Sequence, residues 1–254
     1  MRSIRPTTTG ARALLGVAAL AACGAAAAGA AGLLTAAEPE EAWRRTSAVA
    51  FPEAAAEALG GRLDGEAVQR LAADLDGESH EIAARAAVLL GAALADPAVD
   101  AAVREEAALV LRVRLESRQS GGARHEIAAD VVAARALDAR AIESAPLAAS
   151  LASLASGESP HPDLAVRVEC ASVALAAGRR DVVPFLLAIL RAETPDQAKS
   201  PRTWERITTL AWVKTRAADA LSRAAGLEMR FRPDGSWAHQ TEEADRLEAA
   251  LQPR

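Results

Sequence analysis

The chain has 254 residues and a formal net charge of −5, and 67 of its residues are alanine. It contains no Tyr, three Phe and four Trp, so large aromatic side chains are too few to fill a conventional globular core. Alanine is the best helix former and takes little room, so the composition predicts helices that pack closely together. The acidic balance, with no basic stripe interleaved with aromatics, argues against a nucleic-acid partner.

The first 37 residues have the pattern of an export or membrane-insertion signal. Arg2, Arg5 and Arg12 give this segment a positive start, and the 25 residues that follow carry no charge. Residues 1–37 are therefore predicted to be a signal peptide or membrane anchor rather than part of the fold, with the rest of the chain outside the cytoplasm. Residues 38–63 are expected to form a tether and a first capping helix.

Three ways of processing this segment follow from its sequence. Leu20-Ala21-Ala22-Cys23, followed by Gly24, resembles the lipobox of bacterial lipoproteins, which implies a diacylated Cys23 as lipid anchor. The uncharged stretch 13–37 is also long enough to cross a bilayer as an uncleaved helix. Alternatively, cleavage after Ala37 releases the protein. The first two routes leave the protein anchored on the extracytoplasmic side of a membrane, and the third secretes it.

Beyond residue 63 the apolar residues recur with a helical period. Val68, Leu71, Ala72 and Leu75 form one apolar stripe, and glycine or proline separates such stripes at regular intervals. The pattern predicts about ten helices. Expected helices include 64–75, 97–117, 143–156 and 181–192, with starts at Pro97 and Pro162 and ends at Gly157, Gly178 and Gly226.

A short pattern recurs along this helical region. The stretch HEIAA occurs at 80–84 and again at 125–129, and the same spacing of aliphatic and small residues returns twice more. Its first positions are Ile82, Ile127, Val166 and Val213, separated by 45, 39 and 47 residues. A period of this size with two helices per unit is typical of HEAT or armadillo-type arrays. The pattern predicts burial at equivalent places of Ile82, Ala86, Val166, Cys170, Val213 and Ala217.

Four stretches resemble bacterial HEAT-like repeats. Three resemble the second helix of a unit and the fourth resembles the link between units: VREEAALVL (103–111), VRVECASVAL (166–175), VKTRAADALSRAAG (213–226) and GRRDVVPFLLAIL (178–190). The resemblance covers about 64–226 and implies an all-α fold, a right-handed α-α superhelix (HEAT-like solenoid) of about four helix pairs, with 227–254 as a C-terminal cap. A tetratricopeptide array has a different period, and a plain helical bundle does not explain the recurrent pattern.

The sequence contains no motif that carries catalysis. It lacks nucleophile-elbow, phosphate-loop, dinucleotide and zinc-protease patterns. Its four histidines are scattered and are expected to be solvated, and Cys170 is expected to be a buried, inert thiol. We therefore predict no catalytic residue, no metal site, no cofactor and no small-molecule substrate.

One helix face is a candidate for partner binding. Trp204, Thr208, Trp212 and Arg216 recur every four residues, away from the apolar face of the same helix. Tryptophan and arginine are enriched at interaction hot spots, so Trp204, Trp212 and Arg216 are predicted to bind a partner. The alternative is that this face packs on 227–254.

Two functions fit these observations. The first is a non-catalytic, membrane-tethered extracytoplasmic scaffold that binds another protein through its solenoid surface. The second is a partner or chaperone subunit of an enzyme, as in the lyase-like HEAT proteins that handle bound pigments.

Overall fold

The computed structural model describes residues 64–117, 128–193 and 201–252, with the side chains of 201–206 excepted. Within these ranges 77% of the residues are helical and there is no strand, which confirms the predicted all-α class. The predictions for the signal segment, Cys23, the tether, His125 and Ile127 lie outside the described residues. The described helices are α4 (Gly65–Leu75), α5 (His80–Ala95), α6 (Ala101–Glu116), α7 (Ala129–Ala136), α8 (Asp138–Glu143), α9 (Ala145–Ser156), α10 (Leu164–Ala176), the 3-10 turn η1 (Arg180–Val182), α11 (Val183–Leu190), α12 (Pro201–Ala225) and α13 (Trp237–Leu251).

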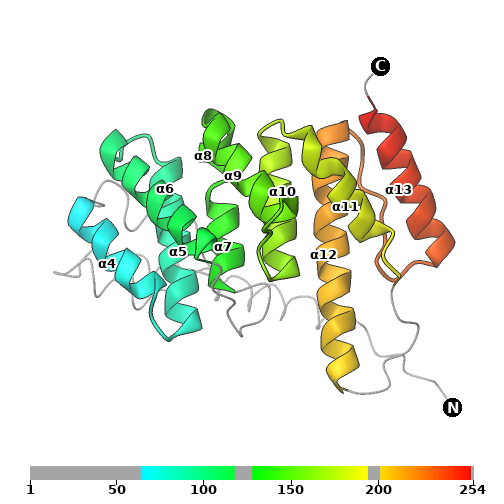
Figure 1. The fold of residues 1–254 in the computed structure, drawn as a ribbon, viewed down its shortest axis with the longest axis horizontal. Helices are drawn as coiled ribbons and strands as arrows, with labels where there is room; N and C mark the ends of the chain where they lie inside the picture. Colours follow the sequence, from blue (N-terminus) through cyan, green and yellow to red (C-terminus); the bar gives the residue numbers. More distant parts are fainter. Residues whose placement is uncertain (1–63, 118–127, 194–200, 253–254) are drawn as a thin grey trace, which may run out of the picture.

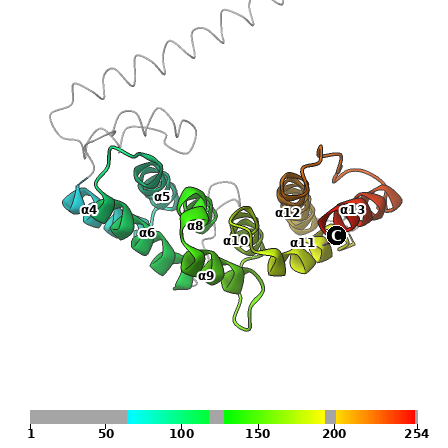
Figure 2. The ribbon, with the colours of Figure 1, turned by 90° about the horizontal axis from the view of Figure 1, so that it is seen from above.

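The helices follow one another across the molecule in chain order, from α4 at one end to α13 at the other (Figure 1). Seen from above, they form two rows that curve together (Figure 2). Helices α4, α6, α9, α11 and α13 lie in the outer row, and α5, α8, α10 and α12 lie on the inner side of the curve. Helix α7 packs between α5 and α10, so it belongs to the inner row.

Short polar side chains begin most of these helices. Asp64 accepts a hydrogen bond from the N–H of Ala67 at 2.9 Å, and Ser79, Ser144, Asp163 and Ser236 cap their helices similarly. The predicted start at Pro97 was wrong. Asp96 instead closes a turn by accepting from the Ala98 N–H, and the N-cap of α6 is Asp100, four residues later.

Glycine ends two inner helices as predicted. Gly178 and Gly226 have φ values of 90° and 64°, in the left-handed region that other residues rarely adopt. After each glycine the next N–H reaches back into the last turn: Arg179 donates to the Ala174 carbonyl and Leu227 to the Ser222 carbonyl, both at 2.9 Å. This Schellman arrangement satisfies carbonyls that the helix end leaves open.

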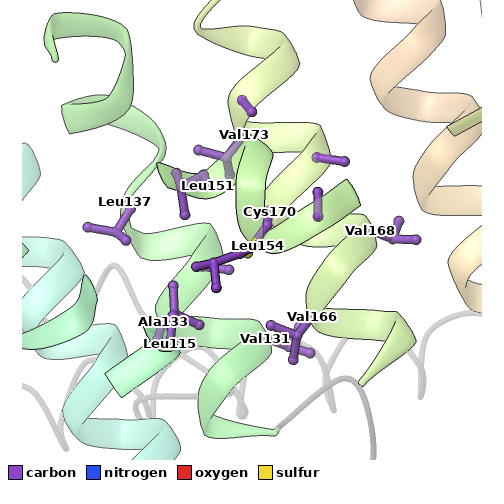
Figure 3. Packing of buried hydrophobic residues seen from close by; sticks show 14 of the residues in the cluster. Leu115, Val131, Ala133, Leu137, Leu151, Leu154, Val166, Val168, Cys170 and Val173 are labelled. Atoms are coloured by element: carbon purple, nitrogen blue, oxygen red, sulfur yellow. The ribbon is translucent and has the colours of Figure 1, made fainter. Parts of the chain in front are cut away.

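The core lies between the two rows and is built mostly from alanine, leucine and valine. The residue four places after the first position of the repeated pattern is fully buried in all four units, at Ala86, Val131, Cys170 and Ala217. Figure 3 shows Cys170 within this cluster, with Leu154 of α9 and Val173 of α10 around it. Val166 and Val213 are buried as predicted.

The prediction for Ile82 was wrong, because its side chain is 38% exposed. Ile82 lies in the first turn of α5, where Ala83 and Ala84 are the buried residues. Ile82 shares a helix face with buried Ala86 one turn later, so its exposure follows from its place in the first turn, where residues 80–82 are all exposed.

Replacing Ala86 or Ala217 with Leu tests the close packing between rows. We expect each substitution to lower the free energy of unfolding by about 1–3 kcal/mol, because neither site has room for the added carbons. Urea denaturation measures the change, and Ala73→Leu on the exposed side of α4 is the matched control, expected within about 0.5 kcal/mol of the wild type. Equal stability of all three variants would contradict the packing.

Candidate functional site

The residue three places after the first position of the repeated pattern carries a charge in every unit. It is Arg85 in α5, Asp130 in α7, Glu169 in α10 and Arg216 in α12. Asp130 and Glu169 are buried, with 2% and 0% exposure. Sequence reasoning missed this feature, although the charge at equivalent places in four inner helices was a readable signal. Buried carboxylates require charged or polar partners, so these positions must organise contacts between helices.

Glu169 joins three inner helices. Arg135 of α7 donates from Nε to its Oε1 at 2.8 Å. Arg216 of α12 donates from Nε to Oε2 and from Nη2 to Oε1, each at 2.8 Å. The Glu169 carboxylate is therefore held by two arginines from neighbouring units, one of them in a two-bond fork.

The charge pattern continues along α12. Arg216 also donates from Nη1 to Asp219 at 2.9 Å, and Asp219 accepts from Arg223 one turn further on at 3.0 Å. Burial by itself would lower the pKa of Arg216. Its bonds to Glu169 and the charges of Glu169, Asp219 and Asp138 outweigh burial and raise that pKa. The guanidinium is thus a fixed positive charge.

A groove of about 330 Å³ lies beside this chain of charges, between α8, α10 and α12. Its charged lining residues are Asp138, Arg180, Arg216, Asp219 and Arg223. Burial is the main cause that raises the pKa of Asp138, against the opposing charges of Arg216 and Arg223. The groove therefore offers charged side chains at the inner row of helices, a place suited to recognising another molecule.

A second charged cluster is buried near the N-terminal end of the described chain. Arg114 of α6 donates from Nε to Asp130 at 2.6 Å and from Nη1 to the carbonyl of Leu75, at the end of α4, at 2.8 Å. Its side chain is 7% exposed. Because this one guanidinium contacts α4 and α7 from α6, the cluster connects both rows of helices.

His161 completes this cluster, and its burial corrects the prediction that the histidines are solvated. The residue is 1% exposed, whereas His80 at the start of α5 is exposed as predicted. The N–H of Asp163 donates to His161 Nδ1 at 3.1 Å, so in the neutral ring the proton lies on Nε2. Nε2 lies 3.9 Å from Asp130 Oδ2. Nothing in the local sequence distinguished His161 from the other histidines.

The predicted partner-binding face is only partly described. The side chain of Trp204 lies outside the described residues. Trp212 is half-buried and packs against the core, so at this point the face is not separate from the apolar face as the sequence suggested. Arg216 is turned toward α10 and Glu169. A role of Trp204, Trp212 and Arg216 in binding a partner stays a prediction.

The contact of α12 with the C-terminal segment is made by a residue that the sequence analysis did not single out. Lys214 is fully buried, and its Nζ donates to Gln240 of α13 at 2.7 Å and lies 5.6 Å from the centre of the Trp237 ring. Burial lowers the pKa of Lys214. Lys214 therefore connects α12 to α13. It lies on a different side of α12 from Arg216, which contacts α10.

The remaining chemistry of the described residues is sparse. Burial, strengthened by the charges of Glu169 and Asp130, raises the pKa of the Cys170 thiol, so the thiol stays protonated. In the described ranges no group of three or more His, Cys, Asp or Glu is placed to hold a metal ion. None of the helices in the described part of the chain combines the length and apolar character needed to cross a bilayer.

Comparison of the chain with protein-family models, with curated proteins and with solved structures finds no match.

Proposed function

We propose that this protein is a non-catalytic, membrane-tethered extracytoplasmic scaffold that binds another protein through the inner side of a helical solenoid. The observation that carries the proposal is the groove between α8, α10 and α12, which is lined by five charged side chains. These three helices lie on the inner side of the curved array (Figure 2). Curved helical arrays offer long continuous surfaces and use them mainly for binding.

The finer architecture belongs to the same proposal. Helices pack in four consecutive outer–inner pairs, α4 with α5, α6 with α7, α9 with α10 and α11 with α12. Equivalent residues of the four inner helices, such as Ala86 and Ala217, are buried alike. Both features support a HEAT-like right-handed superhelix of about four helix pairs.

The membrane attachment is tested through Cys23. Cells that express the full chain are labelled with a radioactive fatty acid, and the protein is then isolated. We expect label in the wild type and none in Cys23→Ala, because diacylation takes place on that thiol. Cys170→Ala is the matched control and should keep the label. A full-length, unlabelled and membrane-bound wild type would contradict lipidation and favour an uncleaved spanning helix.

Binding of a partner is tested by capture from solubilised membranes. The full chain with a C-terminal affinity tag is crosslinked in cells, extracted in detergent and purified. We expect one protein at a constant ratio to the bait. A bait that carries a chromophore or a metal instead would contradict the scaffold and favour the alternative role as partner or chaperone subunit of an enzyme.

A further inference from the structure

The groove between α8, α10 and α12 has more accessible positive than negative charge. Arg180 at its rim is exposed and has no ion pair within the described part of the chain. The side chain of Arg223 is 74% exposed, whereas that of Asp219 is 25% exposed, and Asp138 is the one exposed carboxylate of the lining. The lining carries three arginines and two carboxylates, in a chain whose net charge is −5. Arg216 is compensated by Glu169, so the positive excess of the groove rests on exposed Arg180 and Arg223, against one exposed carboxylate.

The arginines of the groove are arranged so that one of them can be released. Asp219 is held by Arg216 as well as by Arg223. When Arg223 turns toward a ligand, Asp219 keeps its bond to Arg216, and Arg216 keeps its fork on Glu169. Breaking an exposed surface pair of this kind costs little free energy, so Arg223 can exchange Asp219 for a ligand.

We propose that the groove recognises the carboxylates of an acidic segment of a partner protein, with Arg180 and Arg223 as the contacting residues. This inference rests on the proposed scaffold function and names the chemistry of its partner. Planar guanidinium groups match carboxylates in two-bond forks. The groove is lined by α8, α10 and α12, which lie on the inner side of the curved array (Figure 2). A concave side can surround an extended polypeptide segment but cannot lie flat on a membrane.

Gly178 keeps the rim of the groove open. It lines the groove, and a Cβ atom at this position would have no heavy atom within 4 Å. A peptide backbone can therefore approach the end of α10 next to Arg180 without meeting a side chain.

The test measures binding of a fluorescein-labelled octaglutamate peptide to the purified full chain in detergent, by fluorescence anisotropy at low salt. We expect binding that weakens as salt is added, because the contacts are exposed charge pairs. Arg180→Gln combined with Arg223→Gln should raise the Kd about tenfold or more, since two charged forks are lost. Circular dichroism checks that the double variant keeps its helix content.

The matched control is Arg70→Gln combined with Arg232→Gln. These arginines lie outside the groove lining and are 42% and 70% exposed, and each has an acidic neighbour within 4 Å. The control should keep the wild-type Kd within about twofold, as expected for surface positions. An equal loss in both double variants would overturn the proposal, as would equal binding of an octaglutamine peptide.

Two further results would also overturn it. One is binding to phosphatidylglycerol vesicles that exceeds peptide binding and disappears in Arg180→Gln/Arg223→Gln, which would make the groove a lipid site. The other is displacement of the peptide by millimolar inorganic phosphate when sodium chloride of the same ionic strength leaves the peptide bound. If the crosslinking experiment yields a partner whose capture is unchanged in this double variant, the scaffold function stands and the groove inference falls.

Discussion

Replacing Asp130 with Asn is expected to lower the free energy of unfolding by about 3–5 kcal/mol. The carboxylate of Asp130 is 2% exposed and accepts from Arg114 Nε at 2.6 Å. Arg114 is itself 7% exposed, so the substitution removes its buried counter-charge. Its bond to the Leu75 carbonyl and its longer contact with Asp76, at 3.4 Å, remain, but the first acceptor is neutral and Asp76 is 68% exposed, so neither replaces a buried carboxylate.

The effect is measured by urea denaturation followed by far-ultraviolet circular dichroism. Glu66→Gln is the matched control, because Glu66 is 80% exposed and pairs with Arg70 at 3.8 Å. Its loss should change the free energy by less than about 1 kcal/mol. The double variant Arg114→Met/Asp130→Leu should recover part of the lost stability, since it leaves no unpaired charge. If Asp130→Asn changes stability no more than Glu66→Gln, Arg114 is not the buried charge that the structure describes.

The helices themselves were predictable from the sequence because local chemistry determines them. Asp64 and Asp163 sit before apolar stripes and cap α4 and α10, and Gly178 and Gly226 end α10 and α12. The start of α6 was less predictable, because Asp96 and Asp100 are both possible N-caps. Asp96 accepts a hydrogen bond from the N–H of Ala98 and closes a turn, and Asp100 caps α6 by accepting from the N–H of Ala102. Both aspartates can cap a helix, so local propensity does not decide which of them does.

The charged contacts between helices were not predictable in the same way. Glu169 and Arg216 hold equivalent positions in adjacent units, a signal that the sequence analysis missed. Even this signal does not give their pairing, which depends on the rotation of α10 against α12. Lys214 and Arg216 are two residues apart and face different neighbours, α13 and α10. Sequence spacing places both on one helix but does not say which neighbour each side chain meets.

These contacts also explain how neighbouring inner helices of an alanine-rich array are held at one position along each other. The core between these helices is apolar, whereas a buried charged group has to meet its partner, so charged contacts add a requirement on register that apolar packing alone does not make. Glu169 fixes the register of α7, α10 and α12 because its bonds to Arg135 and Arg216 form only at one relative position. The same arginine, Arg216, then lines the groove, so the register of the array and the geometry of the candidate site depend on one carboxylate.

Glu169→Gln is therefore expected to affect stability and the groove together. We expect a loss of about 2–3 kcal/mol in the free energy of unfolding, less than for Asp130→Asn, because Arg135 and Arg216 are 49% and 23% exposed and water can replace part of what they lose. The matched control is Glu143→Gln, whose side chain is 64% exposed and pairs with Arg140. It should change stability by less than about 1 kcal/mol.

The second readout of Glu169→Gln separates a role in register from a role in stability alone. At low temperature, where the variant remains folded, Arg216 loses its fork and is free to turn toward Asp219 and the groove. We expect the Kd for the octaglutamate peptide to change at least threefold, which corresponds to a change in binding free energy of roughly 0.7 kcal/mol or more. Ala86→Leu destabilises the array through packing far from the groove and should leave that Kd unchanged. A Glu169→Gln variant that loses stability but binds the peptide like Ala86→Leu would show that the carboxylate holds the helices together without setting the geometry of the groove.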